Sequence, residues 1–162
     1  MADRIIAFPP VAPEGARLLI LGSMPSVEAL NQGFYYAHPR NAFWRILSEA
    51  LDEPLPSDIP EKVALLERRG IALWAVLQSC EREGSLDSAI RRPVPNDFAG
   101  LFARCPSIGR VLFNGGTAYS LFMKHAANWL EERAWTRLPS TSPAYTLSYE
   151  RKLALWRDAL NG

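Results

Sequence analysis

Arg17–Gly22 reads RLLILG, a short apolar run that ends at a glycine. A run of this length and composition predicts a strand buried on both faces of a sheet. Three further segments of similar character are predicted to be strands: Ile71–Leu77, Arg110–Asn114 and the shorter Trp135–Leu138. Amphipathic segments with capping or breaking residues alternate with these runs, and they predict helices at Asn41–Leu51, Pro60–Arg69, Asn96–Arg104, from about Thr117, and Ser148–Leu160.

Strands that alternate with helices imply right-handed crossovers and a parallel sheet covered on both faces. We therefore expect an α/β fold, a three-layer α/β/α sandwich with a short, mostly parallel four-stranded sheet, in a single domain spanning residues 1–162. Ligands of such sheets bind beyond the carboxyl ends of the strands. The four strand exits carry small or amide-bearing residues: Gly22–Ser26, Gln78–Cys80, Asn114–Gly116 and Pro139–Ala144. None of these exits carries a histidine for general-base catalysis or a pair of carboxylates.

Composition narrows the functional class. The chain has 162 residues, 48% hydrophobic and 22% charged, and a formal net charge of +1, which excludes a strongly polybasic binder but not a local basic stripe for DNA. Cys80 and Cys105 lie far apart, so they cannot supply four iron–sulfur ligands and do not suggest a secreted disulfide scaffold. No apolar run approaches the roughly 20 residues that span a membrane, and Asp3 and two prolines interrupt the stretch where a signal peptide needs apolar residues. We expect a soluble cytoplasmic enzyme with no membrane partner.

Two segments near the first strand are candidates for a ligand pocket. Gly22–Ser26 (GSMPS) is a tight loop of small residues where a backbone can approach a ligand closely, although an ordinary strand-to-helix turn has the same composition. Phe34–Trp44 holds five aromatic residues with one His, one Arg and one Asn in eleven positions, a density that suits a pocket in which a flat base stacks. We expect Phe43 and Trp44, on the predicted helix, in the core, and Tyr36, in a proline-bounded loop, in the pocket.

The loop Leu138–Tyr145 (LPSTSPAY) is a third candidate. Two prolines stiffen it, and its hydroxyls and backbone N–H groups suit contacts to phosphates. Asn114, at the end of the third predicted strand, is either a helix cap or a ligand contact. Its position in the sequence leaves both readings open.

Taken in order, these segments resemble the uracil-DNA glycosylase superfamily. The resemblance is carried by GSMPS at Gly22–Ser26, YAHPRNAFW at Tyr36–Trp44, CEREGSLDSAI at Cys80–Ile90 and LPSTSPA at Leu138–Ala144. It runs from about Arg17 to the C-terminus and is most similar to the hypoxanthine-DNA (deoxyinosine) glycosylase branch. Each piece alone is a weak signal, whereas the ordered set of four is fairly specific.

The resemblance implies a pocket at the strand ends that receives a flipped nucleotide, and a monomeric enzyme acting on double-stranded DNA that contains a deaminated base. We expect no metal or other cofactor, because no group of Cys, His and carboxylates has ligand spacing. Carried over by position, the resemblance makes Asn41 first and Asn114 second the catalytic amides, Gly22, Ser23, Met24, Tyr36 and His38 base contacts, and Ser26, Ser140, Thr141, Ser142 and Pro143 DNA contacts. His38 is equally well read as a structural histidine in its turn, and Asn41 is also placed to cap a helix.

Two departures from the family pattern bear on the substrate. Met24 stands where mismatch-specific relatives have Asn and many uracil enzymes have Asp, and a thioether cannot orient a nucleophilic water. Ala75 stands where uracil enzymes hold the pyrimidine edge with Asn. Both departures argue against a dedicated uracil pocket and favour hypoxanthine, whose O6 and N7 can accept hydrogen bonds from an amide as the base departs.

Other functional classes fit less well. The chain has no G-x-S-x-G motif and only His38 and His125 as a possible base, which disfavours a Ser or Cys hydrolase. It also lacks the G-x-G-x-x-G of dinucleotide-binding domains. Two alternatives stay open: a uracil or mismatch-specific uracil/thymine glycosylase, and a non-catalytic nucleic-acid or nucleotide-binding module in which Met24 and Ala75 mark lost catalysis.

Overall fold

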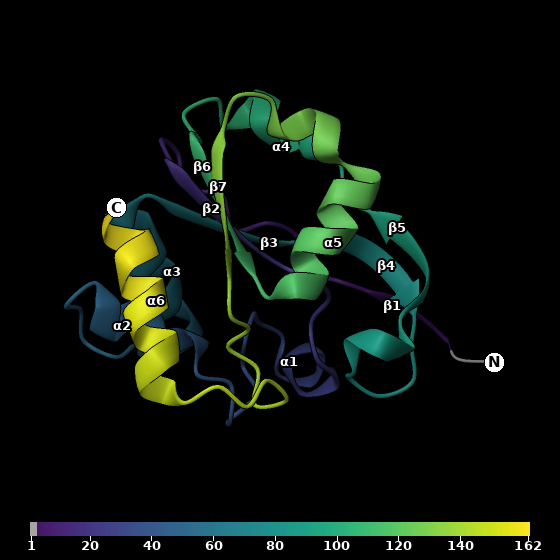
Figure 1. Cartoon of the computed structure of the whole chain (residues 1–162), viewed down its shortest axis with the longest axis horizontal. Helices are drawn as coiled ribbons and strands as arrows, with labels where there is room; N and C mark the ends of the chain where they lie inside the picture. The colour runs from purple at the N-terminus through teal and green to yellow at the C-terminus, as the bar shows by residue number, and fades with distance from the viewer. Residues whose placement is uncertain (1–2) are drawn as a thin grey trace.

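The computed structural model describes residues 3–162, and a four-stranded parallel sheet lies at its centre (Figure 1). Its strands run in the order β3-β2-β6-β7 and comprise β2 (Leu18–Gly22), β3 (Ile71–Ala75), β6 (Arg110–Asn114) and β7 (Ala134–Leu138). The inner strands β2 and β6 are almost wholly buried, as expected for apolar runs covered on both faces. All four predicted strands are present, with ends within two residues of those expected.

Helices cover both faces of this sheet, which confirms the predicted three-layer α/β/α sandwich. Figure 1 shows α2 (Phe43–Ala50), α3 (Ile59–Arg69) and α6 (Tyr149–Asn161) on one side, and α4 (Phe98–Arg104) and α5 (Gly116–His125) on the other. A short helix that the sequence pattern did not predict, α1 (Val27–Gln32), follows β2. Ser26 caps it, because its Oγ accepts the N–H of Ala29 at 3.1 Å.

Aromatic side chains hold each helical layer in place. Phe43 of α2 meets Trp156 of α6 edge-on, with ring centroids 6.1 Å apart. On the other face, Phe122 of α5 packs against Phe98 of α4 at 5.0 Å and against Phe113 of β6 at 5.3 Å. All five side chains are at most 1% exposed, and each contributes about 1.5–3 kcal/mol by leaving water. The positions of α2 and β6 beside the strand ends are therefore well fixed.

A second sheet, antiparallel and three-stranded, corrects one part of the sequence interpretation. It contains β1 (Arg4–Ile6), β4 (Leu77–Glu81) and β5 (Arg91–Pro95), in the order β1-β4-β5. The predicted strand Ile71–Leu77 is thus two strands, since β3 ends at Ala75 and Leu77 begins β4. The 3₁₀ helix η1 (Asp87–Ala89) lies in the connection from β4 to β5, and η2 (Ala127–Leu130) follows α5.

The helix ends follow the capping signals in the sequence with small shifts. Helix α2 begins at Phe43 rather than directly after Asn41, and the Asn41 side chain still accepts the Phe43 N–H at 3.0 Å. Gly70 ends α3 with a φ of +65°, and Ser148 caps α6. Within residues 3–162, no helix combines the length and the apolar character needed to cross a membrane.

Candidate active site

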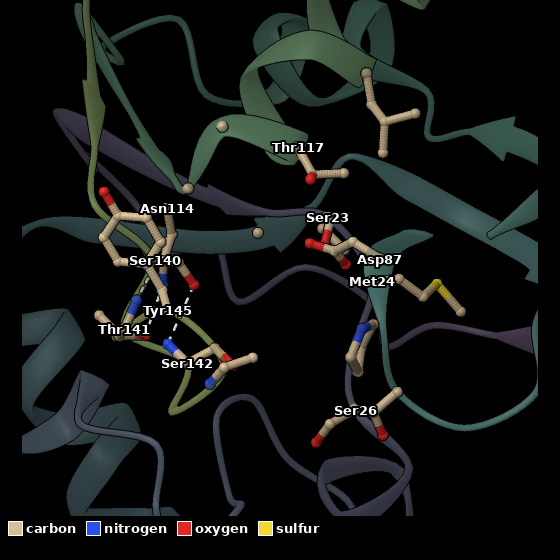
Figure 2. Close-up of a pocket in the computed structure, with 18 of the residues that line it drawn as sticks. Ser23, Met24, Ser26, Asp87, Asn114, Thr117, Ser140, Thr141, Ser142 and Tyr145 are labelled. Atoms are coloured by element: carbon tan, nitrogen blue, oxygen red, sulfur yellow. Dashed lines mark hydrogen bonds between the residues drawn. The ribbon is translucent and has the colours of Figure 1, made fainter. Parts of the chain in front are cut away.

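A pocket of about 690 Å³ opens at the carboxyl ends of the parallel strands (Figure 2). Its walls include the last residues of three strands, Gly22 of β2, Ala75 of β3 and Asn114 of β6, and the loop after β7 contributes Ser140. Parallel sheets bind their ligands at this edge, and the volume is in the range of small-molecule sites. This pocket is therefore the candidate active site.

Most of the residues predicted from the sequence line this pocket, namely Gly22, Ser23, Met24, Ser26, Tyr36, Asn41, Asn114, Ser140, Thr141 and Ser142. His38 and Pro143 are not among its lining residues. His38 accepts the Arg40 N–H at Nδ1, at 3.0 Å, which is a contact within its own turn. Pro143 is exposed on the loop whose neighbouring residues line the pocket. The fold thus brings the predicted motifs together and leaves these two side chains outside the cavity.

Tyr36 forms an aromatic wall with a fixed orientation. Its φ is +56°, in the left-handed region that bulky residues rarely adopt, and its ring stacks on buried Phe43 with centroids 4.1 Å apart. A ligand can therefore stack only on the face that Phe43 leaves free. Burial raises the pKa of Tyr36, hydrogen bonding with Asn114 lowers it in part, and the charge of Asp87 raises it, with a net upward shift. The hydroxyl consequently stays protonated and can donate a hydrogen bond.

The two polar ends of the Asn41 side chain have different roles: the oxygen contacts the protein, and the nitrogen can contact a ligand. Its Oδ1 accepts the N–H of Phe43 at 3.0 Å, which fixes the amide at the start of α2. Among the described residues 3–162, its Nδ2 has no hydrogen-bond partner, and the half-buried side chain lines the pocket. Asn41 can thus donate to a ligand without releasing its contact to the helix.

Asn114 and Thr141 form a buried link between β6 and the loop after β7 (Figure 2). Asn114 Oδ1 accepts the N–H of Thr141 at 3.0 Å, and Asn114 Nδ2 donates to Thr141 Oγ1 at 3.0 Å. The Thr141 carbonyl accepts the N–H of Ala42, at 3.1 Å, next to Asn41. Because Thr141 is only 1% exposed, its polar groups serve the protein, and they tie Asn41, Asn114 and this loop into one unit.

The loop after β7 is shaped by its own hydroxyls and by a buried lysine. Ser140 Oγ accepts the N–H of Ser142 at 3.1 Å, and Ser142 Oγ accepts the N–H of Ala144 at 3.2 Å. Lys152 of α6, which is 5% exposed, donates to the carbonyl oxygens of Ser142 at 3.1 Å and Tyr145 at 2.7 Å. The loop is therefore held in one shape before any ligand arrives.

Asp87 is a pocket residue that the sequence interpretation missed. It comes from η1, between β4 and β5, and it supplies the one acidic side chain among the described residues that line the pocket. The Ser23 hydroxyl donates to Asp87 Oδ1 at 2.7 Å. The available signal was the resemblance of Cys80–Ile90 to the glycosylase branch, to which no role was attached. Within residues 3–162, no group of three or more His, Cys, Asp or Glu side chains is arranged to hold a metal ion.

The two positions that depart from the family pattern both lie in the pocket wall. Met24 is 8% exposed and Ala75 is 2% exposed. The Ala75 carbonyl is already occupied, because it accepts from Asn96 Nδ2 at 2.7 Å. At these two positions the pocket wall therefore presents a thioether and a methyl group in place of a carboxylate or an amide.

The position of the pocket at the strand ends agrees with a comparison of the sequence with known protein families. The sequence model of the family described as "Uracil DNA glycosylase superfamily" matches residues 9–161 of this chain. The chain belongs to this superfamily. The expectation drawn from the four motifs is therefore confirmed, and the pocket at the strand ends is the active-site candidate of a superfamily member.

Three relatives of this superfamily member are named as DNA glycosylases. It is 41% identical over 112 residues to a Methanosarcina acetivorans protein named Hypoxanthine DNA glycosylase, covering 68% of this chain and 71% of that protein. A Methanosarcina barkeri protein of the same name is 39% identical over 109 residues, covering 67% and 69%. An NMR structure of a candidate uracil DNA glycosylase from Methanosarcina acetivorans superposes with a TM-score of 0.82 at 32% identity, covering 98% of this chain and 97% of the other.

Proposed function

We propose that this superfamily member is a monofunctional DNA glycosylase that flips hypoxanthine out of DNA and hydrolyses its N-glycosidic bond. The observation that carries the substrate assignment is the set of polar groups in the pocket. Asn41 offers a free amide donor, whereas Met24 and Ala75 occupy the positions where the uracil enzymes that the chain resembles carry Asp and Asn. The two relatives named Hypoxanthine DNA glycosylase support the same substrate.

A flipped base can stack on Tyr36 and approach the backbone at Gly22. Extrusion of a base costs a few kcal/mol, and less when the base is mispaired, as a deaminated base is. Stacking on an aromatic side chain returns about 1–3 kcal/mol. Gly22 lies directly beside the Tyr36 hydroxyl, because a Cβ added at Gly22 would come within 2.8 Å of that oxygen. The glycine thus lets the ring and the strand end lie close together.

Gly22→Ala is expected to slow inosine excision by about tenfold to a hundredfold, the scale of displacing a positioning group by about 1 Å. The methyl group would push Tyr36, whose ring cannot move freely because it stacks on Phe43. The double variant Gly22→Ala/Tyr36→Phe should recover most of the rate. Without the hydroxyl, the nearest ring carbon lies 3.6 Å from the added Cβ, an ordinary contact. Single-turnover rates of the four proteins in this cycle test the interpretation, and equal rates for the Gly22→Ala protein with and without the second change would contradict it.

Catalysis follows from the bond that breaks. Cleavage of an N-glycosidic bond passes through a sugar with oxocarbenium character and a departing base that carries negative charge. Hypoxanthine exposes O6 and N7 as acceptors, and the Asn41 amide can donate to one of them as charge develops there. Asn114, whose side-chain oxygen and N–H both contact Thr141 and which also hydrogen-bonds Tyr36, holds the pocket wall. We therefore assign the main donor role to Asn41 and a supporting one to Asn114.

The rim of the pocket suits a DNA strand. Ser140 and Ser142 present hydroxyls on a preformed loop, and such groups make the phosphate contacts that position a protein on DNA. Lys124 and Arg137 also line the pocket and add positive charge, which favours DNA binding. We propose a monomeric enzyme without a metal or other cofactor, folded as the single unit that the family match over residues 9–161 suggests, and acting on double-stranded DNA inside the cell.

A panel of four duplexes tests this function. The duplexes are identical except for one position that carries inosine, uracil, xanthine or ethenocytosine, and each is incubated with the protein in EDTA. We expect alkali-sensitive abasic sites, formed fastest at inosine and without added metal. A shift in gel mobility without strand cleavage by alkali would instead identify a binding module. Loss of turnover in EDTA, with recovery on adding zinc or magnesium, would overturn the metal-free mechanism.

A further inference from the structure

Asp87 is held at the pocket in a way that leaves half of its carboxylate free. The Ser23 hydroxyl donates to Oδ1 at 2.7 Å. Within residues 3–162, Oδ2 has no hydrogen-bond partner, and no other acidic side chain lines the pocket. An exposed carboxylate that is fixed by one oxygen can use the second oxygen to accept a proton or a hydrogen bond.

Several contacts fix the segment that carries Asp87 against the loop after β2. Ser85 Oγ accepts the N–H of Val27 at 2.8 Å. Arg82, only 4% exposed, donates to the carbonyl of Pro25 at 2.7 Å and to that of Gly84 at 2.7 Å. Two of these bonds join Arg82 and Ser85 to Pro25 and Val27, close in the chain to the Ser23–Asp87 contact. The carboxylate therefore belongs to a built wall of the pocket rather than to a freely moving loop.

The position of Asp87 suits the sugar better than the base. Figure 2 shows Asp87 and Ser23 on one side of the pocket, facing Asn114 and Ser140 on the other. Asp87 is exposed to solvent, whereas Asn114 is 8% exposed and Ala75 only 2%. A flipped nucleotide enters base first, so its base reaches the buried strand ends and its deoxyribose stays near the solvent-exposed rim. The exposed Asp87 is therefore nearer to this rim than the buried Asn114 and Ala75 are.

We propose that Asp87 is the catalytic carboxylate of this pocket, which orients the attacking water and stabilises the cationic sugar. The inference rests on the proposed glycosylase function and deepens it. In the loop after β2, Met24 occupies the position where many uracil enzymes that the chain resembles carry Asp. Asp87, which comes from a different element, contacts the neighbouring residue of this loop, Ser23. A carboxylate on the sugar side stabilises the positive charge that develops at C1′.

The reaction balances with water as the only co-reactant. The C1′–N9 bond breaks, and its electron pair leaves with the base, whose developing charge the Asn41 amide stabilises. The water oxygen forms the new bond to C1′, and Oδ2 of Asp87 takes the proton that this water loses. Transfer of that proton to the departed base through solvent restores the carboxylate and gives neutral hypoxanthine and an abasic site.

The charge of Asp87 gives the proposal a distinctive signature. A carboxylate beside a DNA strand repels its phosphates, so removing the charge should favour binding while it slows chemistry. Asp87→Asn keeps an oxygen that can accept from the Ser23 hydroxyl, and the loop geometry should therefore survive. We expect this variant to bind inosine duplex at least as tightly as the natural protein and to excise about a hundredfold or more slowly, the scale of a lost general base.

The experiment measures single-turnover excision and duplex affinity for the natural protein, Asp87→Asn, Asp87→Ala and the matched control Glu83→Gln. Glu83 is exposed in the same loop and does not line the pocket, so its variant should excise at the normal rate. Sodium formate should restore part of the Asp87→Ala rate, relative to sodium chloride at equal ionic strength, because formate can enter the space left by the carboxylate.

Three results would overturn the inference. Near-normal excision by Asp87→Asn together with slow excision by Asp87→Ala would reduce Asp87 to a positioning residue for Ser23. Weaker duplex binding that accounts for the whole loss of activity would make it a DNA contact. An equal loss in Glu83→Gln would show that the loop, not this carboxylate, is sensitive. If the natural protein releases no base from any of the four duplexes, the proposed function fails as well, and this outcome is distinct from the other three.

Discussion

Asn114→Ala is expected to combine the largest loss of stability with a loss of excision of at least about a hundredfold. The substitution leaves the N–H and the hydroxyl of Thr141 without their partner in a site that is 1% exposed. An unsatisfied buried donor costs roughly 1–3 kcal/mol, and each kcal/mol lowers the melting temperature by about 2–4 °C in a chain of this size. The same change frees the loop Ser140–Ser142 and removes an amide from the pocket, so catalysis suffers on both counts.

Thermal melting and single-turnover excision of Asn114→Ala should be compared with those of Thr141→Val. The valine variant removes only the hydroxyl and keeps the bond from the Thr141 N–H to Asn114 Oδ1. It should therefore melt closer to the natural protein and retain more activity. Equal melting temperatures for the natural and Asn114→Ala proteins would contradict the structural role assigned to Asn114.

Asn41→Asp is expected to leave the protein folded and to slow inosine excision by about a hundredfold, the effect of one lost preorganised donor. Asp and Asn cap helices about equally well, and the carboxylate can still accept the Phe43 N–H that Asn41 Oδ1 accepts now. The two residues differ because an ionised Asp cannot donate to the departing base. The substitution therefore separates the capping role of Asn41 from its proposed catalytic role.

The measurement pairs thermal melting with single-turnover excision for Asn41→Asp and Asn41→Ala. The alanine variant loses both functions, so it should be slow and also less stable by about 1 kcal/mol. A stable Asn41→Asp protein with near-normal inosine excision would reduce Asn41 to a cap, and the donor role would pass to Asn114.

The central sheet was predictable because its strands obey a local rule. Segments such as Arg17–Gly22 and Arg110–Asn114 have wholly apolar interiors and end at small or polar residues, as is typical of strands buried on both faces. Three of the four strand exits then followed from topology, and with them most of the pocket lining. The fourth was wrong, because Gln78–Cys80 lies within β4 and does not line the pocket. The cap of α6 at Ser148 was equally predictable from the sequence, since a Ser before an amphipathic run can accept a hydrogen bond from one of the first free N–H groups of a helix.

The second sheet and Asp87 were not predictable in the same way. Strand β5 reads RRPVP, and two prolines disguise a strand that tolerates them only because it lies at the edge of its sheet. Strand β4 (LQSCE) is short and largely polar, so its pattern does not distinguish it from a loop. Asp87 enters the pocket from the connection between these two strands, and its bond to Ser23 spans 64 positions in the sequence. Contacts of this kind depend on the folded arrangement of both sheets.

Hypoxanthine excision is tested most directly by single-turnover assays on an inosine duplex and on the otherwise identical uracil duplex, in EDTA, with the released base identified by mass. The pocket offers the amide of Asn41 and no carboxylate or amide at Met24 or Ala75. We therefore expect free hypoxanthine in equal amount to abasic sites, released faster than uracil. Uracil release that outruns hypoxanthine release would contradict the assigned substrate, and tight binding of both duplexes with no free base would contradict catalysis itself.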